Sequence, residues 1–211
     1  MILIGNYDSP FVRRVGVAMH HYNFPFQRKV ISVFKDFDAM LEINPLGKVP
    51  ALETNNGDLL VDSRFIIDYL DELAEDERKL IPVNSKERQA VLQIEAIALG
   101  LAETSVGLRI ELYRKNPTAH DPDWISRLEQ QIRSALTWLE NSNPSPWLYG
   151  SRLTLPDITT VIAYTYLKQK LPDFVPPNKY PCLDKLCHQC EALNEFYSAQ
   201  YSDSEAQASE F

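Results

Sequence analysis

Short apolar runs separated by turn residues dominate the first eighty positions of the chain. Ile2 to Ile4 form a run that stops at Gly5-Asn6 and predicts a buried strand, and Gln27 to Val33, with three β-branched residues, predicts a second one. Between them, apolar residues recur at helical spacing after Ser9-Pro10, which predicts a helix that starts there. The order strand, helix, strand favours two parallel strands joined by a right-handed crossover.

Two very short strands and another helix are predicted next. Residues 44–50 contain two prolines and a glycine and predict a loop. Residues 51–53 and 59–61 predict strands around an Asn-Asn-Gly-Asp turn, and an apolar helical face begins at about Ser63. The order βαβ followed by ββα predicts a thioredoxin-like α/β domain, which we expect to span residues 1–78.

The pattern after this domain is helical throughout. A polar stretch before Pro82 predicts a linker at 79–85, followed by an all-α C-terminal domain at 86–201. The polar, acidic residues 202–211 are expected to form a flexible tail.

Three helix starts in this second part carry capping signals. Asn84 with Glu87 resembles a capping box, and Asp121-Pro122 starts another helix by the same logic. The strongest signal pairs Thr154 with Asp157, flanked by Leu153 and Ile158 as a hydrophobic staple.

Composition narrows the class of protein. The 211 residues carry 21 basic and 29 acidic side chains, a formal charge of −8, and an acidic surface repels phosphate backbones, so we expect no nucleic-acid partner. The first ten residues lack the pattern of a signal peptide, and we find no long uncharged apolar run of transmembrane length. We therefore expect a soluble, cytoplasmic protein with no membrane partner.

The cysteines suggest neither a disulfide framework nor a metal centre. Cys182, Cys187 and Cys190 are odd in number and lie in one segment, as in a reducing compartment. Cys187-His188-Gln189-Cys190 could suggest zinc, but it offers fewer than four ligands and reads as a helix, so no metal is expected.

The start of the first predicted helix is suited to holding a thiolate. In a thioredoxin-like domain the unpaired amides and positive dipole end of this helix face an open crevice. Ser9 stands there, and its hydroxyl can donate a hydrogen bond to sulfur. A helix terminus and one hydroxyl donor together stabilise a thiolate enough to lower the pKa of the thiol by about one to two units from its free value of about 8.5. The nucleophilic thiolate is then available at neutral pH. Plain helix capping by Ser9 is the alternative.

Further groups in the predicted α/β domain are suited to binding a peptide ligand. A cis bond at Val49-Pro50 would leave the main chain of Val49 able to pair with a bound peptide, although an ordinary trans turn is the alternative. Asp62 suits an ammonium group and Ser63 a carboxylate, although both can simply cap a helix. Lys35 and Lys48 are candidates for a second carboxylate. A γ-glutamyl-cysteinyl-glycine tripeptide has features complementary to all of these.

Three segments resemble the glutathione-site motifs of the soluble glutathione S-transferases: Ser9-Pro10-Phe11-Val12-Arg13, Asn44 to Leu52, and Asp62-Ser63. Leu153 to Asp157 is similar to the capping box and staple of that family's helical domain. The resemblance runs from Met1 to about Tyr201, and the Ser-Pro-Phe opening is similar to serine-type classes and to bacterial members such as the YibF-like group.

This resemblance implies roles for individual residues. Ser9 would contact the glutathione sulfur, Val49 would pair with the cysteinyl backbone before cis Pro50, and Asp62 with Ser63 would hold the γ-glutamyl end. Lys35 and Lys48 would lie near the glycine carboxylate. Tyr7 is a rival to Ser9, because tyrosine-type members use a tyrosine near the end of the first strand. No cysteine stands at position 9, so dithiol redox chemistry is not expected.

The function that the resemblance implies is a glutathione transferase with a role in detoxification. Glutathione would be the co-substrate, with no metal, and its thiolate would attack a small hydrophobic electrophile bound between the domains. We expect the second-substrate pocket to be lined by Tyr7, Val12, Arg109 and Tyr113, although each could instead be core or surface. A homodimer is also implied. A glutathione-binding or regulatory module without turnover is the alternative.

Overall fold

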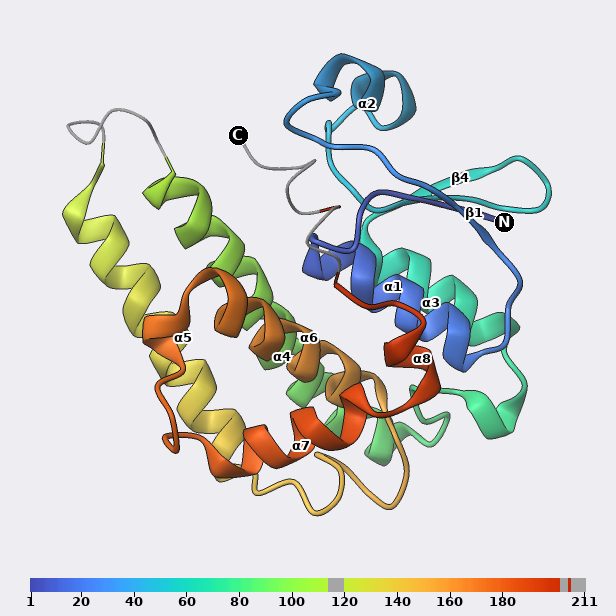
Figure 1. Cartoon of the computed structure of the whole chain (residues 1–211). Helices are drawn as coiled ribbons and strands as arrows, with labels where there is room; N and C mark the ends of the chain where they lie inside the picture. Colours follow the sequence, from blue (N-terminus) through green and yellow to red (C-terminus); the bar gives the residue numbers. More distant parts are fainter. Residues whose placement is uncertain (114–119, 202–204, 206–211) are drawn as a thin grey trace. The chain divides into compact units, whose positions relative to one another are not determined.

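A computed structural model of the chain describes residues 1–113, 120–201 and 205. The chain divides into two compact units, Met1–Leu80 with Ala192–Phe211, and Ile81–Glu191. The first is an α/β unit and the second is helical (Figure 1). The C-terminal segment from Ala192 is thus grouped with the α/β unit, whereas the sequence placed residues up to 201 in the helical domain.

The α/β unit contains a mixed sheet of four short strands. They are β1 (Ile2–Ile4), β2 (Gln27–Lys29), β3 (Ala51–Glu53) and β4 (Leu59–Val61), in the order β2-β1-β3-β4. β1 pairs with β2 in parallel, and β3 is antiparallel to both β1 and β4. The structure thus confirms the predicted thioredoxin-like arrangement of strands.

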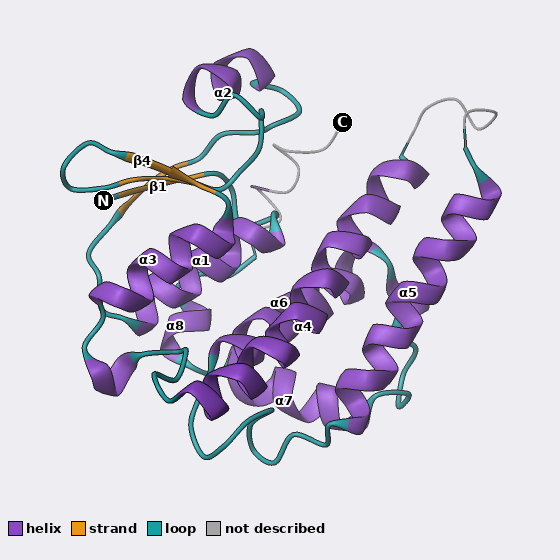
Figure 2. Cartoon of the chain, turned by 180° about the vertical axis from the view of Figure 1, so that it is seen from behind, coloured by secondary structure: helices purple, strands orange, loops and turns teal. Residues whose placement is uncertain are grey.

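Helices cover both faces of this sheet (Figure 2). α1 (Pro10–His21) and α3 (Ser63–Leu73) pack against each other and against the strands on one face, and α2 (Phe37–Ile43) lies on the other. Met40 of α2 forms a buried cluster with Ile4 and Ala51. Because side chains alternate across a strand, Leu3 and Leu52, both fully buried, face the α1 side.

Two local predictions for this unit were incomplete. The second strand was predicted over Gln27 to Val33 but ends at Lys29, after which the chain leaves the sheet. α2 was not predicted at all, because it is short and Met40 is its one buried residue, so it shows no clear apolar face. The short helix η1 (Asp76–Arg78) lies within the polar stretch before Pro82 from which the linker was predicted.

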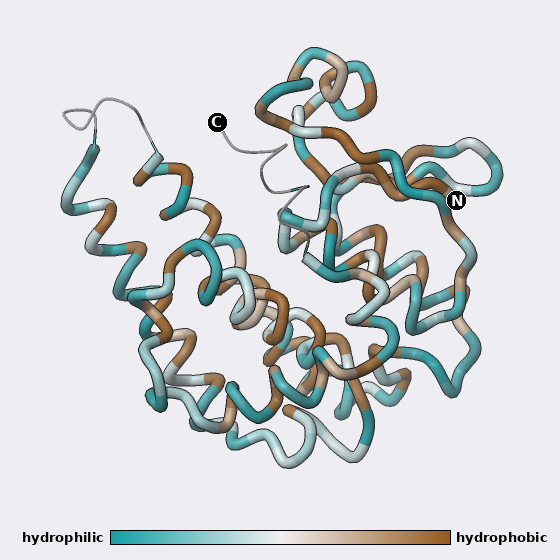
Figure 3. The backbone as a smooth tube through the Cα atoms, in the orientation of Figure 1, coloured by the Kyte–Doolittle hydropathy of each residue, from teal (hydrophilic) through white to brown (hydrophobic). Residues whose placement is uncertain are grey.

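The helical unit is built on a core helix, α4 (Ser85–Leu112), which packs against α5 (Pro122–Asn141) and α6 (Leu155–Lys170). Among the described residues, α4 is long and apolar enough to cross a membrane, whereas the sequence analysis expected no apolar run of that length. Half of its apolar window is buried within the structure, which is also what the core helix of a globular protein shows. In Figure 3 brown, hydrophobic residues alternate with teal, hydrophilic ones along these helices, as expected for helices with one buried face.

The predicted helix starts are confirmed. The side chain of Asn84 accepts from the amides of Lys86 and Glu87, and that of Asp121 caps α5. At α6 the carboxylate of Asp157 accepts from the Thr154 amide at 2.8 Å and the Thr154 hydroxyl at 2.7 Å. It also accepts from the Leu148 amide at 2.7 Å. Burial raises the pKa of Asp157 to about 6, although these hydrogen bonds act in the opposite direction.

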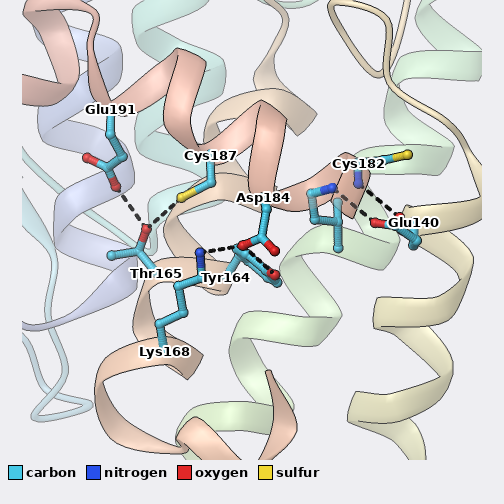
Figure 4. Close-up of polar contacts among 9 residues, drawn as sticks. Glu140, Tyr164, Thr165, Lys168, Cys182, Asp184, Cys187 and Glu191 are labelled. Carbon is cyan, nitrogen blue, oxygen red and sulfur yellow. Dashed lines mark hydrogen bonds and ion pairs between the residues drawn. The ribbon is translucent and has the colours of Figure 1, made fainter. Parts of the chain in front are cut away.

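The last helix of this unit, α7 (Pro181–Glu191), follows the short η3 (Pro172–Phe174) and is held by side chains of other helices (Figure 4). The carboxylate of Glu140, on α5, accepts from the amides of Cys182 and Leu183 at 2.9 and 3.0 Å. Asp184 accepts from Tyr164 and Lys168 of α6. Glu140 therefore caps the start of a helix whose first amides lie 42 and 43 residues away in sequence.

The C-terminal segment is tied to α1. α8 (Asn194–Tyr197) contacts α1, and Arg13 Nε donates to the carbonyl of Ala199 at 2.8 Å. The predicted flexible tail, 202–211, lies outside the described residues apart from Glu205.

Candidate active site

The three segments singled out in the sequence meet at one edge of the sheet. In the strand register, Ile4 at the end of β1 pairs with Ala51 at the start of β3, and Ala51 pairs with Val61 at the end of β4. The residues that follow β1, precede β3 and follow β4 therefore emerge at the same edge. These are the segments that carry Ser9, Val49-Pro50 and Asp62-Ser63.

Gly5 allows the first two segments to approach closely. Its φ is +128°, and a Cβ at this position would lie 2.6 Å from Val12 Cγ2 and 3.0 Å from Val49 Cβ. Any larger residue would push the end of β1 away from α1 and from Val49. Gly5 thus lets Val49 pack beside the start of α1.

Ser9 is the N-cap of α1. Its Oγ accepts from the Val12 amide at 3.4 Å, at the long end for a hydrogen bond, and its backbone is extended, as a cap requires. Because this oxygen serves as an acceptor, its proton can be donated to a ligand. Ser9 is half-buried and stands where the dipole of α1 favours negative charge.

Tyr7, the rival hydroxyl, lies elsewhere. Its side chain is 3% exposed, and a Cβ on Gly16 would come within 2.7 Å of its hydroxyl oxygen. Gly16 is seven residues beyond Ser9, or about 10 Å along α1, so this hydroxyl is two turns away from the start of the helix. Burial raises the pKa of Tyr7 to about 12. The geometry favours Ser9 as the group at a bound sulfur.

The Val49–Pro50 peptide bond is cis, as predicted. The loop before this bond is held by the buried side chain of Asn44. The sequence motif includes Asn44, but the motif alone gave it no separate role. Asn44 Nδ2 donates to the Lys48 carbonyl at 2.7 Å, and its Oδ1 accepts from the Leu46 amide at 3.0 Å. Asn44 therefore fixes the main chain that leads into Val49.

Asp62 and Ser63 form the start of α3. Asp62 has φ 68° and caps the helix by accepting from the Arg64 amide at 2.9 Å. A non-glycine residue in this conformation costs about 1–3 kcal/mol and is typical of ligand sites. The carboxylate of Asp62 is exposed, whereas Ser63 is buried.

Arg14 orients Ser63, a role that the sequence reading missed. Arg14 Nη1 donates to Ser63 Oγ at 3.1 Å, and both side chains are buried. Since Ser63 Oγ accepts this hydrogen bond, its own proton can be donated to a carboxylate. No local signal could have revealed the pair, because forty-nine residues separate its members.

The remaining candidates are placed as follows. Lys35 and Lys48 are exposed in the loops on either side of α2, and their proposed contact with a carboxylate stays a prediction. Val12 is fully buried against Gly5. In the helical unit, Arg109 lies 3.6 Å over the ring of Tyr113 and donates to its hydroxyl. The pocket lining by Tyr7, Val12, Arg109 and Tyr113 likewise stays a prediction.

The three cysteines of the chain all lie in α7. Cys187 and Cys190 are buried, and Cys187 Sγ lies 3.6 Å from Thr165 Oγ1 (Figure 4). Within residues 1–113, 120–201 and 205, no three His, Cys, Asp or Glu side chains are grouped so that they could hold a metal ion.

The fold and the edge site define a thioredoxin-like domain joined to a helical unit. Residues 3–78 match the family model of the glutathione S-transferase N-terminal domain. The chain is 30% identical to the GST-like protein YibF of Escherichia coli (strain K12), over 79% of this chain and 82% of that one. These matches show that the chain belongs to the glutathione S-transferase family.

Solved structures of similar proteins also belong to this family. A glutathione transferase family member from Pseudomonas fluorescens Pf-5, with bound glutathione, is 30% identical, with a TM-score of 0.85 over 95% of this chain and 98% of that one. A structure of a family member from the same strain with bound S-(propanoic acid)-glutathione has a TM-score of 0.80 at 30% identity, over 96% of this chain and 100% of that one.

Proposed function

We propose that this protein is a glutathione transferase that binds glutathione, activates its thiol at Ser9 and adds it to a hydrophobic electrophile. The observation that carries the proposal is the convergence of Ser9, Val49-Pro50 and Asp62-Ser63 at one edge of the sheet. The glutathione-bound relative from Pseudomonas fluorescens, similar over nearly its whole length, supports the choice of ligand.

Each group has a part to which its geometry is suited. The γ-glutamyl ammonium group pairs with the exposed carboxylate of Asp62, and the γ-glutamyl carboxylate accepts from Ser63, whose hydroxyl Arg14 orients. The cysteinyl backbone pairs with Val49 as a short strand would. Lys35 and Lys48 lie near the glycine carboxylate, and the sulfur then lies at the start of α1.

The chemistry is a nucleophilic displacement or addition at carbon. The thiol loses its proton to solvent, and the thiolate is stabilised by the Ser9 hydroxyl and the dipole of α1. With an aryl halide, a carbon–sulfur bond forms, the carbon–halogen bond breaks and halide leaves with the bonding electrons. Lowering the thiol pKa by one unit requires about 1.4 kcal/mol of preference for the thiolate, which one hydroxyl donor and a helix terminus can supply.

The test compares the two hydroxyls. Glutathione binding is measured by calorimetry, and conjugation of a generic aryl halide is followed for the wild type, Ser9→Ala and Tyr7→Phe. We expect Ser9→Ala to lower kcat/KM about 10- to 100-fold and to raise the pKa of the bound thiol, read from thiolate absorbance. Tyr7→Phe should change kcat/KM less than about twofold, because its hydroxyl lies at Gly16. Loss of turnover in Tyr7→Phe alone would show that Tyr7 is the catalytic hydroxyl.

The alternative function is a glutathione-binding or regulatory module. A serine that caps a helix serves both functions, so binding with no turnover towards a panel of electrophiles would favour the module. Failure to bind glutathione would overturn both. We further propose that the protein is a cytoplasmic homodimer with a role in detoxification, as in the family, which sedimentation and cell fractionation can test.

A further inference from the structure

A carboxylate of the C-terminal segment is bound at the end of β1. Glu205 Oε1 accepts from Arg28 Nη1 at 2.7 Å, and Glu205 Oε2 accepts from Arg28 Nη2 at 2.9 Å and from the Tyr7 amide at 2.8 Å. Two of these hydrogen bonds come from the fork of one arginine, a geometry that matches a carboxylate. The partners lie 177 and 198 residues away in sequence from Glu205.

The donors of this site are positioned by the α/β unit itself. The guanidinium of Arg28 stacks on the Tyr7 ring, 3.5 Å from its centroid, and Arg28 Nη2 also donates to the Gly5 carbonyl at 3.3 Å. The Tyr7 ring in turn lies against Gly16 of α1. The site is thus built from β1, β2 and α1, and Glu205 contributes only the anion.

The bound carboxylate lies close to the candidate sulfur position. The Tyr7 amide is two residues before Ser9, and two residues of chain span at most about 7 Å. A substituent of two or three carbons on a sulfur at Ser9 is long enough to approach this distance. A group that binds Arg28 would therefore belong to the electrophile and not to glutathione.

Glu205 should be displaceable. Its carboxylate and the Arg28 side chain are still 18% and 24% exposed, so the pair is not closed off from solvent and a competing carboxylate can reach it. Holding the Glu205 side chain in one conformation also costs entropy, which offsets part of the gain. A carboxylate attached to bound glutathione has a high effective concentration at the same donors and can compete.

On these grounds we propose that Arg28 and the Tyr7 amide form a carboxylate-binding subsite that Glu205 fills, and that the second substrate is an electrophile with a carboxylate that displaces Glu205. This inference rests on the proposed function, because it names the substrate class for the same site.

The experiment compares two glutathione conjugates that differ only in charge. S-(2-carboxyethyl)glutathione and its neutral carboxamide, together with glutathione itself, are titrated by calorimetry into the full chain. The variants are Arg28→Gln, Arg28→Lys and Glu205→Gln. Glu195→Gln is the matched control, since it removes a carboxylate of the same C-terminal segment that pairs with His21 instead.

We expect the wild type to bind the carboxylate conjugate more tightly than the carboxamide. Arg28→Gln should abolish this preference, Arg28→Lys should keep part of it, and Glu205→Gln should strengthen carboxylate binding about tenfold, as loss of a charge-assisted competitor predicts. The carboxamide and glutathione should change less than about twofold in every variant, and Glu195→Gln should match the wild type.

The outcomes separate the two proposals. Equal affinity for both conjugates, or a preference that survives Arg28→Gln, would overturn the subsite while leaving glutathione binding intact. A preference that Glu205→Gln leaves unchanged would overturn displacement of Glu205. If the wild type bound neither glutathione nor a conjugate, the proposed function itself would fall, and the subsite with it.

Discussion

The ring of Tyr7 lies directly against Gly16 of α1, where a Cβ would meet Tyr7 Cε1 at 2.6 Å and its hydroxyl oxygen at 2.7 Å. The guanidinium of Arg28 stacks over the same ring, 3.5 Å from its centroid. The Tyr7 ring therefore contacts both a helix and a cation. This packing keeps its hydroxyl away from the start of α1, where Ser9 stands.

This contact makes Gly16→Ala destabilising. Overpacking against the buried ring should cost more than the better helix propensity of alanine returns, so we expect a net loss of about 1–2 kcal/mol in the free energy of unfolding, measured with urea. Gly100→Ala on α4 is the matched control, because a Cβ there meets nothing within 4 Å. It should stabilise the protein by about 0.5–1 kcal/mol. Equal effects at the two glycines would contradict the packing of Tyr7.

The charge of Asp62 can be tested without removing its cap. In Asp62→Asn the side-chain oxygen can still accept from the Arg64 amide, but no negative charge remains for the γ-glutamyl ammonium group. We expect glutathione affinity to fall about tenfold in calorimetry, since a charge-assisted hydrogen bond is lost. Stability should change by less than about 0.5 kcal/mol.

Asp58→Asn provides the control for this prediction. Asp58 is an exposed carboxylate in the turn before β4, at the opposite end of that strand from Asp62. Its substitution should leave glutathione affinity unchanged. If both variants lost affinity equally, the overall charge of the unit and not the site would be responsible.

The parts of the site that depend on local chain chemistry could be predicted from the sequence. Ser9-Pro10 predicts the start of a capped helix. The turn residues on either side of β3 and β4 limit each predicted strand to three residues. The contacts that orient those residues could not be predicted, because they join distant segments: Arg14 with Ser63, and Arg28 with Glu205. A buried arginine looks like any surface arginine in a sequence, since only tertiary packing buries it.

The boundaries of the α/β unit show the same limit. α2 was missed because a seven-residue helix with one buried side chain has almost no periodic signal. The sequence pattern predicted that the residues up to 201 belong to the helical domain. In the structure, the segment from Ala192 is grouped with the first unit. Its contacts, such as that of the Arg13 side chain with the Ala199 carbonyl, join residues far apart in the chain and leave no mark in composition.

Glu140 should be essential to the stability of α7. In Glu140→Ala the amides of Cys182 and Leu183 lose their carboxylate acceptor, so we expect a loss of about 1–2 kcal/mol in the free energy of unfolding. Glu129→Ala, on the same helix α5, should change stability by less than about 0.5 kcal/mol. Urea denaturation followed by circular dichroism measures both. A Glu140→Ala protein as stable as the control would show that solvent satisfies these amides equally well.

A last prediction concerns acid stability and the contact between α1 and α8. Glu195 Oε1 lies 3.2 Å from His21 Nδ1, and His21 Nε2 lies 3.1 Å from the Arg78 carbonyl. Both ring nitrogens therefore lie within hydrogen-bond distance of an oxygen atom. The hydrogen bond from His21 lowers the pKa of Glu195, against the opposing effect of burial.

A carboxyl whose pKa is lowered in the folded state stabilises that state above its unfolded value of about 4.3, and the contribution is lost as the pH falls through the lowered pKa. Glu195→Gln should therefore be about 0.5–1.5 kcal/mol less stable than the wild type at about pH 6, and the difference should shrink at about pH 3. Urea titrations at the two pH values measure this, with exposed Glu75→Gln as the control that should follow the wild type at both. A difference that stayed constant across this range would mean that Glu195 acts through packing and not through its charge.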